Sequence, residues 1–532
     1  MDISRNVLRT VYVFMAFFIV LSGVLVYWQV IVAQQVTSNI HNVRNCLAGN
    51  APQRGRIFDR NGVLLADTQR VPYGCGYIRH YYDPSLAGLI GYYAGANYPA
   101  TGIESAFNNY LTGQSGMTGL DNIINKTLHR PPVGDDIYLT IDERVQHIAE
   151  AAFDTPVAID NNITFASNRG SVIITNPHTG EILAMISRPE YDPNQLVQTL
   201  AKNDLSYYQQ LSQDPEKPLL MRPLDARYPP GSVYKTVTLL AALDSGHTTL
   251  NQQFSKQQAI GPVTFPGGGH PVGPSGNNIA PYTFHFPVTT EYGYVHSDNV
   301  IFAQLGYNTG AATWLNYNQQ FYVGKKIPFD LPVEPSSVTN NGQPLDVDTL
   351  AANAFGQGVD FVTPMQMSLI DNIVANNGQL MRPMIVSKIV DQGGTTLQQN
   401  EPQSLGQVVT EQTAQEVRQA MYGVVRCGSG SLAEVQLVNS PWSIIGKTGT
   451  AELGNGQPAH AWFISQAPYS ITTPDQLPQL TIVAMKENGG EGGQQDGPML
   501  AQMYSNIFSQ VLKTPTPAAP NPNYCATTGL LQ

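Results

Sequence analysis

The chain has few charged residues for its length, and no long basic run. Charged residues make up 13% of its 532 residues, whereas hydrophobic residues make up 42%. An ordinary soluble protein is about one quarter charged, so this chain has enough apolar surface for a large core and is not intrinsically disordered. Its formal net charge is -11. Nucleic acid is therefore excluded as an expected partner.

Cysteine is also scarce, and the usual metal-binding patterns are missing. The four cysteines are Cys46, Cys75, Cys427 and Cys525, and the sequence contains neither a C-x-x-C nor an H-E-x-x-H motif. We therefore expect no metal and no cofactor. Four cysteines allow three disulfide pairings, and the sequence does not choose among them. We favour Cys46 with Cys75 and Cys427 with Cys525.

One long apolar run lies near the N-terminus, and no second run of this length follows. Residues 11–33 are almost continuously apolar, and a helix over this range spans about 34 Å, enough to cross a bilayer. Arg5 and Arg9 precede it, which places residues 1–10 in the cytoplasm and the remainder outside. A cleaved signal peptide is the alternative, but the apolar run is longer than the usual signal segment.

Composition divides the rest of the chain into three parts. Residues 34–165 alternate short extended pieces with turns, and they are predicted to form a β-rich, non-catalytic domain. Residues 166–512 are predicted to form a larger domain. Residues 513–532 contain prolines at 515, 517, 520 and 522, which predicts an extended tail.

The larger domain has the pattern of an α+β fold. Its predicted strands are β-rich runs beside turn residues, at 171–175, 182–186, 443–453, 460–465 and 480–485. Successive pairs read as hairpins and therefore as an antiparallel sheet. Ahead of these strands, Asp142 is a predicted cap for a helix that leads into the domain, and apolar residues from Leu500 to Val511 mark a closing helix after Asp496-Gly497-Pro498. Helices flanking an antiparallel sheet around one core define the expected class.

Ser232 and Lys235 form an S-x-x-K pattern before the apolar run Thr236–Leu243. If Ser232 opens a helix there, its hydroxyl lies at the positive end of the helix dipole and Lys235 lies on the same face. A neutral amine at this place can accept the proton of a serine nucleophile. The pattern alone is weak, because it arises by chance about once in a chain of this length. An exposed helix start with a solvated lysine is the alternative.

Two further patterns strengthen the case. Ser297-Asp298-Asn299 begins 65 residues after Ser232, and Lys447-Thr448-Gly449 follows on a predicted strand. A competing Ser275-Gly276-Asn277 lies within a stretch rich in glycine and proline, and we interpret it as part of a loop. The three patterns in this order are typical of serine β-lactamases and penicillin-binding proteins.

Each further residue has a chemical task. Ser297 can relay a proton between the two lysines and a leaving amine, and Asn299 can hold an amide of the substrate. Lys447, with the hydroxyl groups of Thr448 and Thr450, offers positive charge and hydrogen-bond donors to a substrate carboxylate.

Backbone geometry and charge complete the predicted site. Gly449 leaves room for the strand to approach the serine. The backbone N–H groups of Ser232 and Thr450 are the predicted oxyanion hole. Repulsion between Lys235 and Lys447, together with burial, favours the neutral amine that the mechanism needs.

With these patterns the chain resembles the class B penicillin-binding proteins, which are monofunctional peptidoglycan D,D-transpeptidases. The likeness extends from Pro52 to about Leu512, and the short format is similar to the actinobacterial type. Outside the catalytic patterns it rests on four segments: the opening signature at 54–62, Thr101-Gly102-Ile103-Glu104, Phe355-Gly356-Gln357-Gly358 and His460-Ala461-Trp462-Phe463. The first two resemble elements of the non-catalytic module of that class.

The resemblance implies a serine β-lactamase-like transpeptidase domain on an elongated pedestal, held outside the cell by one membrane span. Ser232 would attack the penultimate D-Ala of a stem pentapeptide, release the last D-Ala, and pass the acyl group to an amine of a neighbouring stem. β-Lactams would trap the same serine. Only residues 34–53 separate the span from the signature, so a polytopic membrane glycosyltransferase is the expected partner for glycan synthesis.

Three other functions fit the sequence less well. A β-lactamase would need a Glu-x-x-x-Asn pattern after Ser297, but Val338 stands four residues after Glu334. A β-lactam sensor would need a cytoplasmic protease, for which ten residues are too few. An inactive scaffold would be expected to lose a catalytic residue, and Ser232 and both lysines are present. The sequence leaves open a role in division or elongation, the acceptor amine (diaminopimelate or lysine), the pedestal partners and the oligomeric state.

Overall fold

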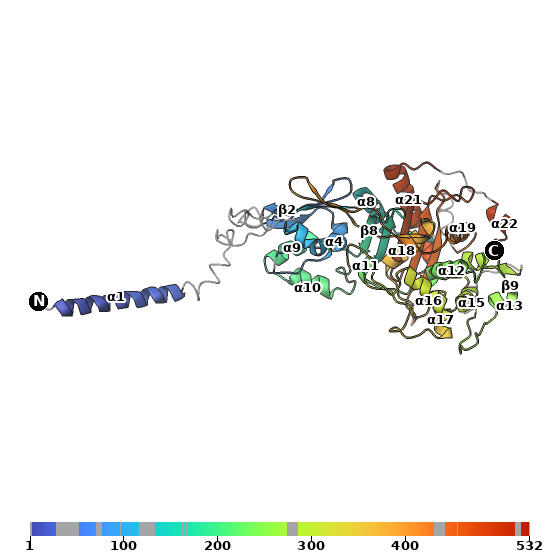
Figure 1. The fold of residues 1–532 in the computed structure, drawn as a ribbon, viewed down its shortest axis with the longest axis horizontal. Helices are drawn as coiled ribbons and strands as arrows, with labels where there is room; N and C mark the ends of the chain where they lie inside the picture. Colours follow the sequence, from blue (N-terminus) through green and yellow to red (C-terminus); the bar gives the residue numbers. More distant parts are fainter. Residues whose placement is uncertain are drawn as a thin grey trace.

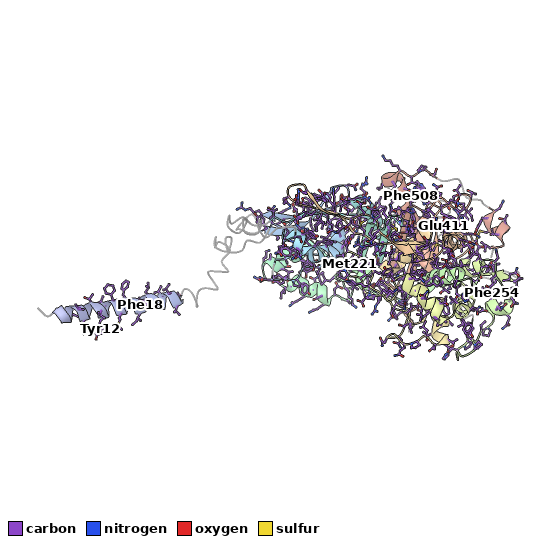
Figure 2. All side chains as sticks on the ribbon, in the orientation of Figure 1. Tyr12, Phe18, Met221, Phe254, Glu411 and Phe508 are labelled. Atoms are coloured by element: carbon purple, nitrogen blue, oxygen red, sulfur yellow. A yellow bond between two sulfur atoms is a disulfide. The ribbon has the colours of Figure 1, made fainter. Side chains whose placement is uncertain are left out.

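The computed structural model describes residues 3–27, 53–70, 77–95, 97–115, 133–160, 163–165, 168–273, 286–429, 442–454, 456–516 and 523–530. Helix α1 (Ile3–Val26) contains a stretch, Val7–Val26, with a mean hydropathy of 2.1. Its large side chains are exposed, as Figure 2 shows for Tyr12 and Phe18, and Phe18 is 70% exposed. The length and composition of α1 fit the predicted membrane anchor.

A five-stranded antiparallel sheet forms the centre of the larger region. Its strands, in spatial order, are β15 (Ile445–Ala451), β16 (His460–Ala467), β17 (Leu480–Lys486), β7 (Gly170–Thr175) and β8 (Ile182–Arg188). All four pairings are antiparallel. Both predicted hairpins and the additional strand are therefore confirmed. Almost every residue of these strands is buried, because helices cover both faces of the sheet.

Helices α8 (Glu143–Phe153) and α21 (Gly492–Asn506) cover one face of the sheet, and α18 (Pro364–Ala375) and α19 (Glu411–Cys427) cover the other. The predicted cap of α8 is confirmed, because the Asp142 side chain accepts a hydrogen bond from the Arg144 backbone N–H. Figure 1 shows these layers beside the N-terminal strands and helices, in an elongated body. The layering confirms the predicted α+β class.

The closing helix begins earlier than predicted. It starts at Gly492, so that Pro498 lies inside the helix instead of ahead of it, and its last turns form the π-helix η4 (Ile507–Leu512). A Cβ atom at Gly492 would lie 2.0 Å from the carbonyl oxygen of Trp462 and 2.6 Å from that of Gly449. The helix start thus packs directly on β15 and β16, and this packing outweighs the weak local helix propensity.

The N-terminal region contains a second sheet, to which distant residues contribute. Its six strands, in spatial order, are β13 (Thr396–Gln399), β12 (Val386–Val390), β4 (Asp136–Leu139), β1 (Ile57–Phe58), β2 (Leu64–Arg70) and β3 (Tyr77–Tyr81). Strands β12 and β13 come from the range predicted for the larger domain, and β12 pairs antiparallel with β4. The two regions therefore share a sheet.

A buried ion-pair cluster explains why two segments of the N-terminal signature belong together. Glu104 is fully buried, and its two carboxylate oxygens lie 2.8 Å from Arg54 and 2.5 Å from Arg79. Arg79 also donates a hydrogen bond to the carbonyl oxygen of Gly55. A buried carboxylate needs such partners, because an unpaired charge in the interior is strongly unfavourable. Arg54 of the segment 54–62 and Glu104 of the segment 101–104 thus form one structural unit.

Residues 523–530 differ from the predicted extended tail. Helix α22 (Tyr524–Thr528) lies in this segment, and Cys525 forms a disulfide with Cys427 at the end of α19. The favoured pairing of these two cysteines is confirmed, whereas Cys46 and Cys75 lie outside the described residues. Proline-rich composition predicted the tail, but the disulfide attaches its last part to the folded body.

Candidate active site

Ser232 and Lys235 are brought together by a tight helical turn. Ser232 lies in the 3-10 turn η3 (Gly231–Tyr234), and helix α12 (Lys235–Asp244) begins only at the lysine. The serine therefore precedes the α-helix that it was expected to open. Side chains three residues apart lie directly above one another in a 3-10 turn. Accordingly, Lys235 Nζ lies 2.8 Å from Ser232 Oγ.

Ser297 lies in the turn between α14 (Thr290–Val295) and α15 (Asn299–Thr309). Its φ of 60° is left-handed, a conformation that a residue other than glycine keeps only when its surroundings hold it. Asp298 caps α15 by accepting a hydrogen bond from the Ile301 backbone N–H at 2.8 Å. The middle residue of this motif is thus structural, and it helps to hold Ser297.

Lys235 Nζ is the centre of the contacts among the three motifs. It lies 2.6 Å from Asn299 Oδ1, 3.0 Å from the carbonyl oxygen of Ser297 and 3.3 Å from Ser297 Oγ. Ser297 Oγ also contacts the second lysine, because it lies 3.0 Å from Lys447 Nζ. A continuous path of contacts therefore runs from Ser232 through Lys235 and Ser297 to Lys447.

The strand β15 supplies the third motif and approaches the serine turn closely. A Cβ atom at Gly449 would lie 2.9 Å from Val233 Cγ1 and 3.1 Å from the carbonyl oxygen of Pro230. Any larger side chain would push the strand away from the turn. Thr448 is buried, and Thr450 is partly exposed beside it. The strand thus carries all four of its predicted site residues to the edge where Ser232 lies.

The structure adds three residues to this site. The sequence patterns had assigned none of them a role there. Gln357 Nε2 donates a hydrogen bond to the carbonyl oxygen of Thr450 at 3.2 Å. Gly356 has a φ of 83°, and a Cβ atom on it would lie 1.9 Å from the carbonyl oxygen of Gly231. Ser429 Oγ lies 2.7 Å from Thr448 Oγ1. The first two stand in a segment that the family resemblance pointed out, whereas Ser429 belongs to no motif.

Burial dominates the electrostatics of the two lysines. It lowers the pKa of Lys235 to about 7, although the nearby carboxylate of Asp298 acts in the opposite direction. Burial, with the positive charge of Lys235, also holds the pKa of Lys447 well below its ordinary value. Two adjacent ammonium groups in a desolvated site repel each other. A neutral amine next to Ser232 is therefore accessible near neutral pH.

We expect the rate of acylation by a fluorescent penicillin to rise with pH through about 7. The neutral amine of Lys235 is the form that accepts a proton, and below its pKa of about 7 the amine is protonated. The rate should therefore fall about tenfold for each pH unit below the pKa and level off above it. Initial labelling rates between about pH 5.5 and 8.5 measure this. Unfolding must be monitored over the same range, and a flat profile from folded protein would contradict the expectation.

One group of side chains in the described residues has the composition of a metal site. Atoms of Asp83, His147 and Glu150 all lie within 4.8 Å of one another. However, Arg188 lies 2.8 Å from the Glu150 carboxylate, and His147 lies 3.2 Å from that of Asp83. These groups already compensate one another, and none of them belongs to the three motifs. The expectation of no metal stays a prediction.

Comparison with known protein families shows the family to which the chain belongs. Residues 170–509, more than half of the chain, match the penicillin binding protein transpeptidase domain. The chain belongs to the penicillin-binding protein transpeptidases. Residues 54–137 of this penicillin-binding protein match the penicillin binding protein A dimerisation domain. The family confirms the predicted fold and the predicted enzyme class, a serine-type D,D-transpeptidase.

Individual relatives cover most of the chain. Peptidoglycan D,D-transpeptidase PbpA of Mycolicibacterium smegmatis is 31% identical over 477 residues, which are 87% of this chain and 89% of the relative. Peptidoglycan D,D-transpeptidase MrdA of Salmonella typhimurium is 26% identical, over 86% of this chain and 76% of the relative. The imipenem acyl-enzyme complex of penicillin-binding protein A from M. tuberculosis superposes with a TM-score of 0.74 at 27% identity, over 87% of this chain and 100% of that one.

Proposed function

We propose that this penicillin-binding protein cross-links peptidoglycan stem peptides through an acyl-enzyme on Ser232, and that β-lactams trap the same serine. The observation that carries the proposal is the 2.8 Å contact between Ser232 Oγ and Lys235 Nζ, in a chain of this family. Relatives named peptidoglycan D,D-transpeptidases support the substrate class. Acyl-enzyme complexes of the mycobacterial protein with imipenem and penicillin G support the β-lactam reaction.

Lys235 acts as the base that activates Ser232. As a neutral amine it has two N–H groups and one lone pair. Its N–H groups donate to Asn299 Oδ1 and to the carbonyl oxygen of Ser297, at 2.6 and 3.0 Å. The lone pair then faces the Ser232 hydroxyl and accepts its proton as Oγ attacks the carbonyl carbon of the penultimate D-Ala.

The remaining residues stabilise and resolve the intermediate. The backbone N–H groups of Ser232 and Thr450 hold the oxyanion. Ser297 Oγ stands between the two lysines, at 3.3 and 3.0 Å, and passes the proton to the nitrogen of the departing D-Ala as the C–N bond breaks. An amine from a neighbouring stem then attacks the Ser232 ester along the reverse path.

Binding of the substrate falls to the strand and to the amide. Lys447 and the hydroxyl groups of Thr448 and Thr450 hold the substrate carboxylate. Gly449 keeps β15 close enough to the serine turn for this contact, because any Cβ atom would meet Val233. The Asn299 amide nitrogen holds a backbone amide of the stem peptide.

The proposed topology places the catalytic region outside the cell. Helix α1 belongs to the anchor, and we place residues 1–10 in the cytoplasm and residues 11–33 in the membrane, because Arg5 and Arg9 precede residue 11. The pedestal is proposed to comprise residues 34–165 and the transpeptidase domain residues 166–512, with two exchanges between them: α8 packs on the central sheet of the transpeptidase domain, and β12 and β13 complete the pedestal sheet. A polytopic membrane glycosyltransferase supplies the glycan strands.

A transfer assay tests this function. The protein is incubated with a stem pentapeptide that ends in D-Ala-D-Ala and with a second stem that carries a free side-chain amine. We expect release of D-Ala together with an amine-dependent peptide dimer. Release of D-Ala with no dimer at any acceptor concentration would contradict transpeptidation and favour hydrolysis. Diaminopimelate and lysine stems, compared side by side, identify the acceptor.

A further inference from the structure

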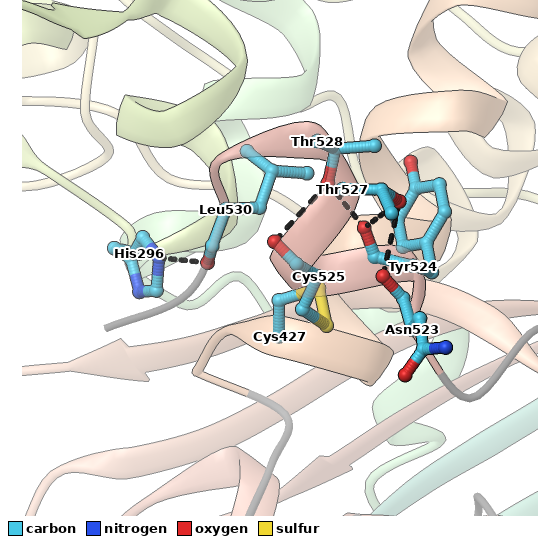
Figure 3. Close-up of a disulfide and its surroundings, with 8 residues drawn as sticks. All are labelled: His296, Cys427, Asn523, Tyr524, Cys525, Thr527, Thr528 and Leu530. Atoms are coloured by element: carbon cyan, nitrogen blue, oxygen red, sulfur yellow. Dashed lines mark hydrogen bonds between the residues drawn. A yellow bond between two sulfur atoms is a disulfide. The ribbon is translucent and has the colours of Figure 1, made fainter.

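The segment 523–530, called here the C-terminal clasp, lies between Cys427 and His296 (Figure 3). Cys525 in the clasp is disulfide-bonded to Cys427, the last residue of α19. At the other end of the clasp, the carbonyl oxygen of Leu530 accepts a hydrogen bond from His296 Nε2 at 3.1 Å. The clasp is thus attached at both ends, once covalently and once to the residue before Ser297.

Between these two attachments, the clasp is seated by apolar packing. The ring of Tyr524 meets that of Tyr422 on α19 edge to face, with ring centroids 4.7 Å apart. Leu530 is buried, and its Cδ1 would lie 3.4 Å from a Cβ atom at Gly423. The disulfide adds a covalent link to these contacts.

His296 is held in a defined chemical state by the clasp. It is 5% exposed, and burial lowers its pKa to about 4, so the ring is neutral at working pH. A carbonyl oxygen only accepts hydrogen bonds, and Nε2 therefore carries the hydrogen and donates it to Leu530. The ring also packs on Tyr292, with ring centroids 4.1 Å apart. The ring of His296 is thus fixed both by packing and by a hydrogen bond.

The position of His296 matters because its neighbour is strained. Ser297 has the left-handed φ of 60°, which persists only where the flanking residues are held. On the far side of Ser297, Asp298 is fixed by its cap on α15. On the near side, His296 is fixed by the clasp. Both neighbours of Ser297 are thus held by hydrogen bonds.

The disulfide also lies next to the contacts that join the end of α19 to the Ser297 turn and to β15. Two residues beyond Cys427, the backbone N–H of Ser429 donates to the carbonyl oxygen of Val295 at 3.1 Å, and its hydroxyl contacts Thr448. A Cβ atom at Gly428 would lie 2.0 Å from the Val295 oxygen. The end of α19 therefore touches both the turn that carries Ser297 and the strand β15.

We propose that His296 is a positioning residue for Ser297, and that the C-terminal clasp, locked by the Cys427–Cys525 disulfide, holds it in place. Reduction of this disulfide then slows the acylation of Ser232. The inference rests on the proposed function, in which Ser297 relays the proton. Once the clasp leaves, the buried His296 N–H loses its acceptor, the turn relaxes, and Ser297 Oγ no longer bridges the lysines.

The first test compares two replacements of His296 in the full-length protein in detergent, labelled with a fluorescent penicillin. His296→Phe keeps a ring against Tyr292 but removes the donor, and we expect an acylation rate constant about tenfold lower at unchanged final labelling. His296→Gln keeps an N–H donor and should recover most of the rate. Tyr524→Phe, which removes only a hydroxyl from the clasp, is the matched control and should behave as wild type.

The second test opens the disulfide. Dithiothreitol supplies two electrons and two protons, which convert the disulfide into two thiols while the reagent becomes a cyclic disulfide. We expect the wild-type acylation rate constant to fall about tenfold after reduction. The Cys427→Ser/Cys525→Ser double variant should be slow from the start and insensitive to the reagent. Any effect of the reagent that persists in the double variant arises elsewhere in the chain.

Each outcome has a defined meaning. Equal acylation rate constants for wild type, folded His296→Phe and the folded double variant would contradict the proposal that the clasp positions Ser297 through His296. Equal losses in His296→Phe and His296→Gln would reduce His296 to a packing residue, which also overturns the proposal. If the double variant does not fold, the two His296 variants decide. Failure of the wild type to label at all would instead contradict the proposed function of Ser232.

Discussion

Ser232→Ala is expected to abolish labelling of the protein by a fluorescent penicillin. The stable adduct is an ester of Ser232 Oγ, and alanine offers no atom with which to form it. Ser297 is another hydroxyl of the motifs, but it lies between the two lysine nitrogens, a place that suits a proton relay. We therefore expect a loss of at least about a thousandfold in acylation. Gel fluorescence after denaturation measures the covalent adduct directly.

The control for this experiment is the serine that follows α12, the helix after the Ser232 turn. Ser245 follows α12, where its hydroxyl donates to the carbonyl oxygen of Ala241. Ser245→Ala should label at the wild-type rate. Persistent labelling of Ser232→Ala would contradict an acyl-enzyme on Ser232. In the wild type, slow release of the drug is expected, whereas turnover within seconds would favour a β-lactamase.

The local part of the site was predictable from the sequence because its geometry is set over a few residues. The spacing of Ser232 and Lys235 brings their side chains together in any helical turn, and the glycine in Lys447-Thr448-Gly449 signals a close backbone approach. The β-rich runs and the turn residues between them likewise predicted both hairpins of the central sheet. Only the order of the motifs, which is typical of one group of enzymes, indicated that the three pieces meet.

The long-range features of the fold and of the site were not predictable from the sequence, because they depend on contacts that leave no local sequence pattern. Residues 386–399 have the composition of ordinary strands, and nothing in them indicates that they join the N-terminal sheet through β4. Ser429 belongs to no motif, and its place next to Thr448 follows from where α19 ends. The prolines before residue 523 predicted a tail, whereas Tyr524–Thr528 form a helix that the Cys427–Cys525 disulfide joins to α19.

Lys235→Arg is the second change for which we expect a large loss, and it separates charge from basicity. Arginine keeps a positive charge at this position but does not lose its proton at any working pH. If Lys235 accepts the Ser232 proton, the acylation rate constant should fall by about a hundredfold to ten-thousandfold, the usual contribution of a positioned base. Stopped-flow measurement with a chromogenic cephalosporin covers this range.

Two matched replacements give this result its meaning. Lys256→Arg, on the exposed surface of α13 (Lys256–Ile260), should leave the rate unchanged. Lys447→Arg keeps the positive charge that its proposed role requires, so its loss should be smaller than that of Lys235→Arg. Because the pKa of Lys235 sets the predicted pH profile, the residual activity of Lys235→Arg should no longer rise through about pH 7. A folded Lys235→Arg protein that acylates at nearly the wild-type rate, with the same profile, would assign the base to another group.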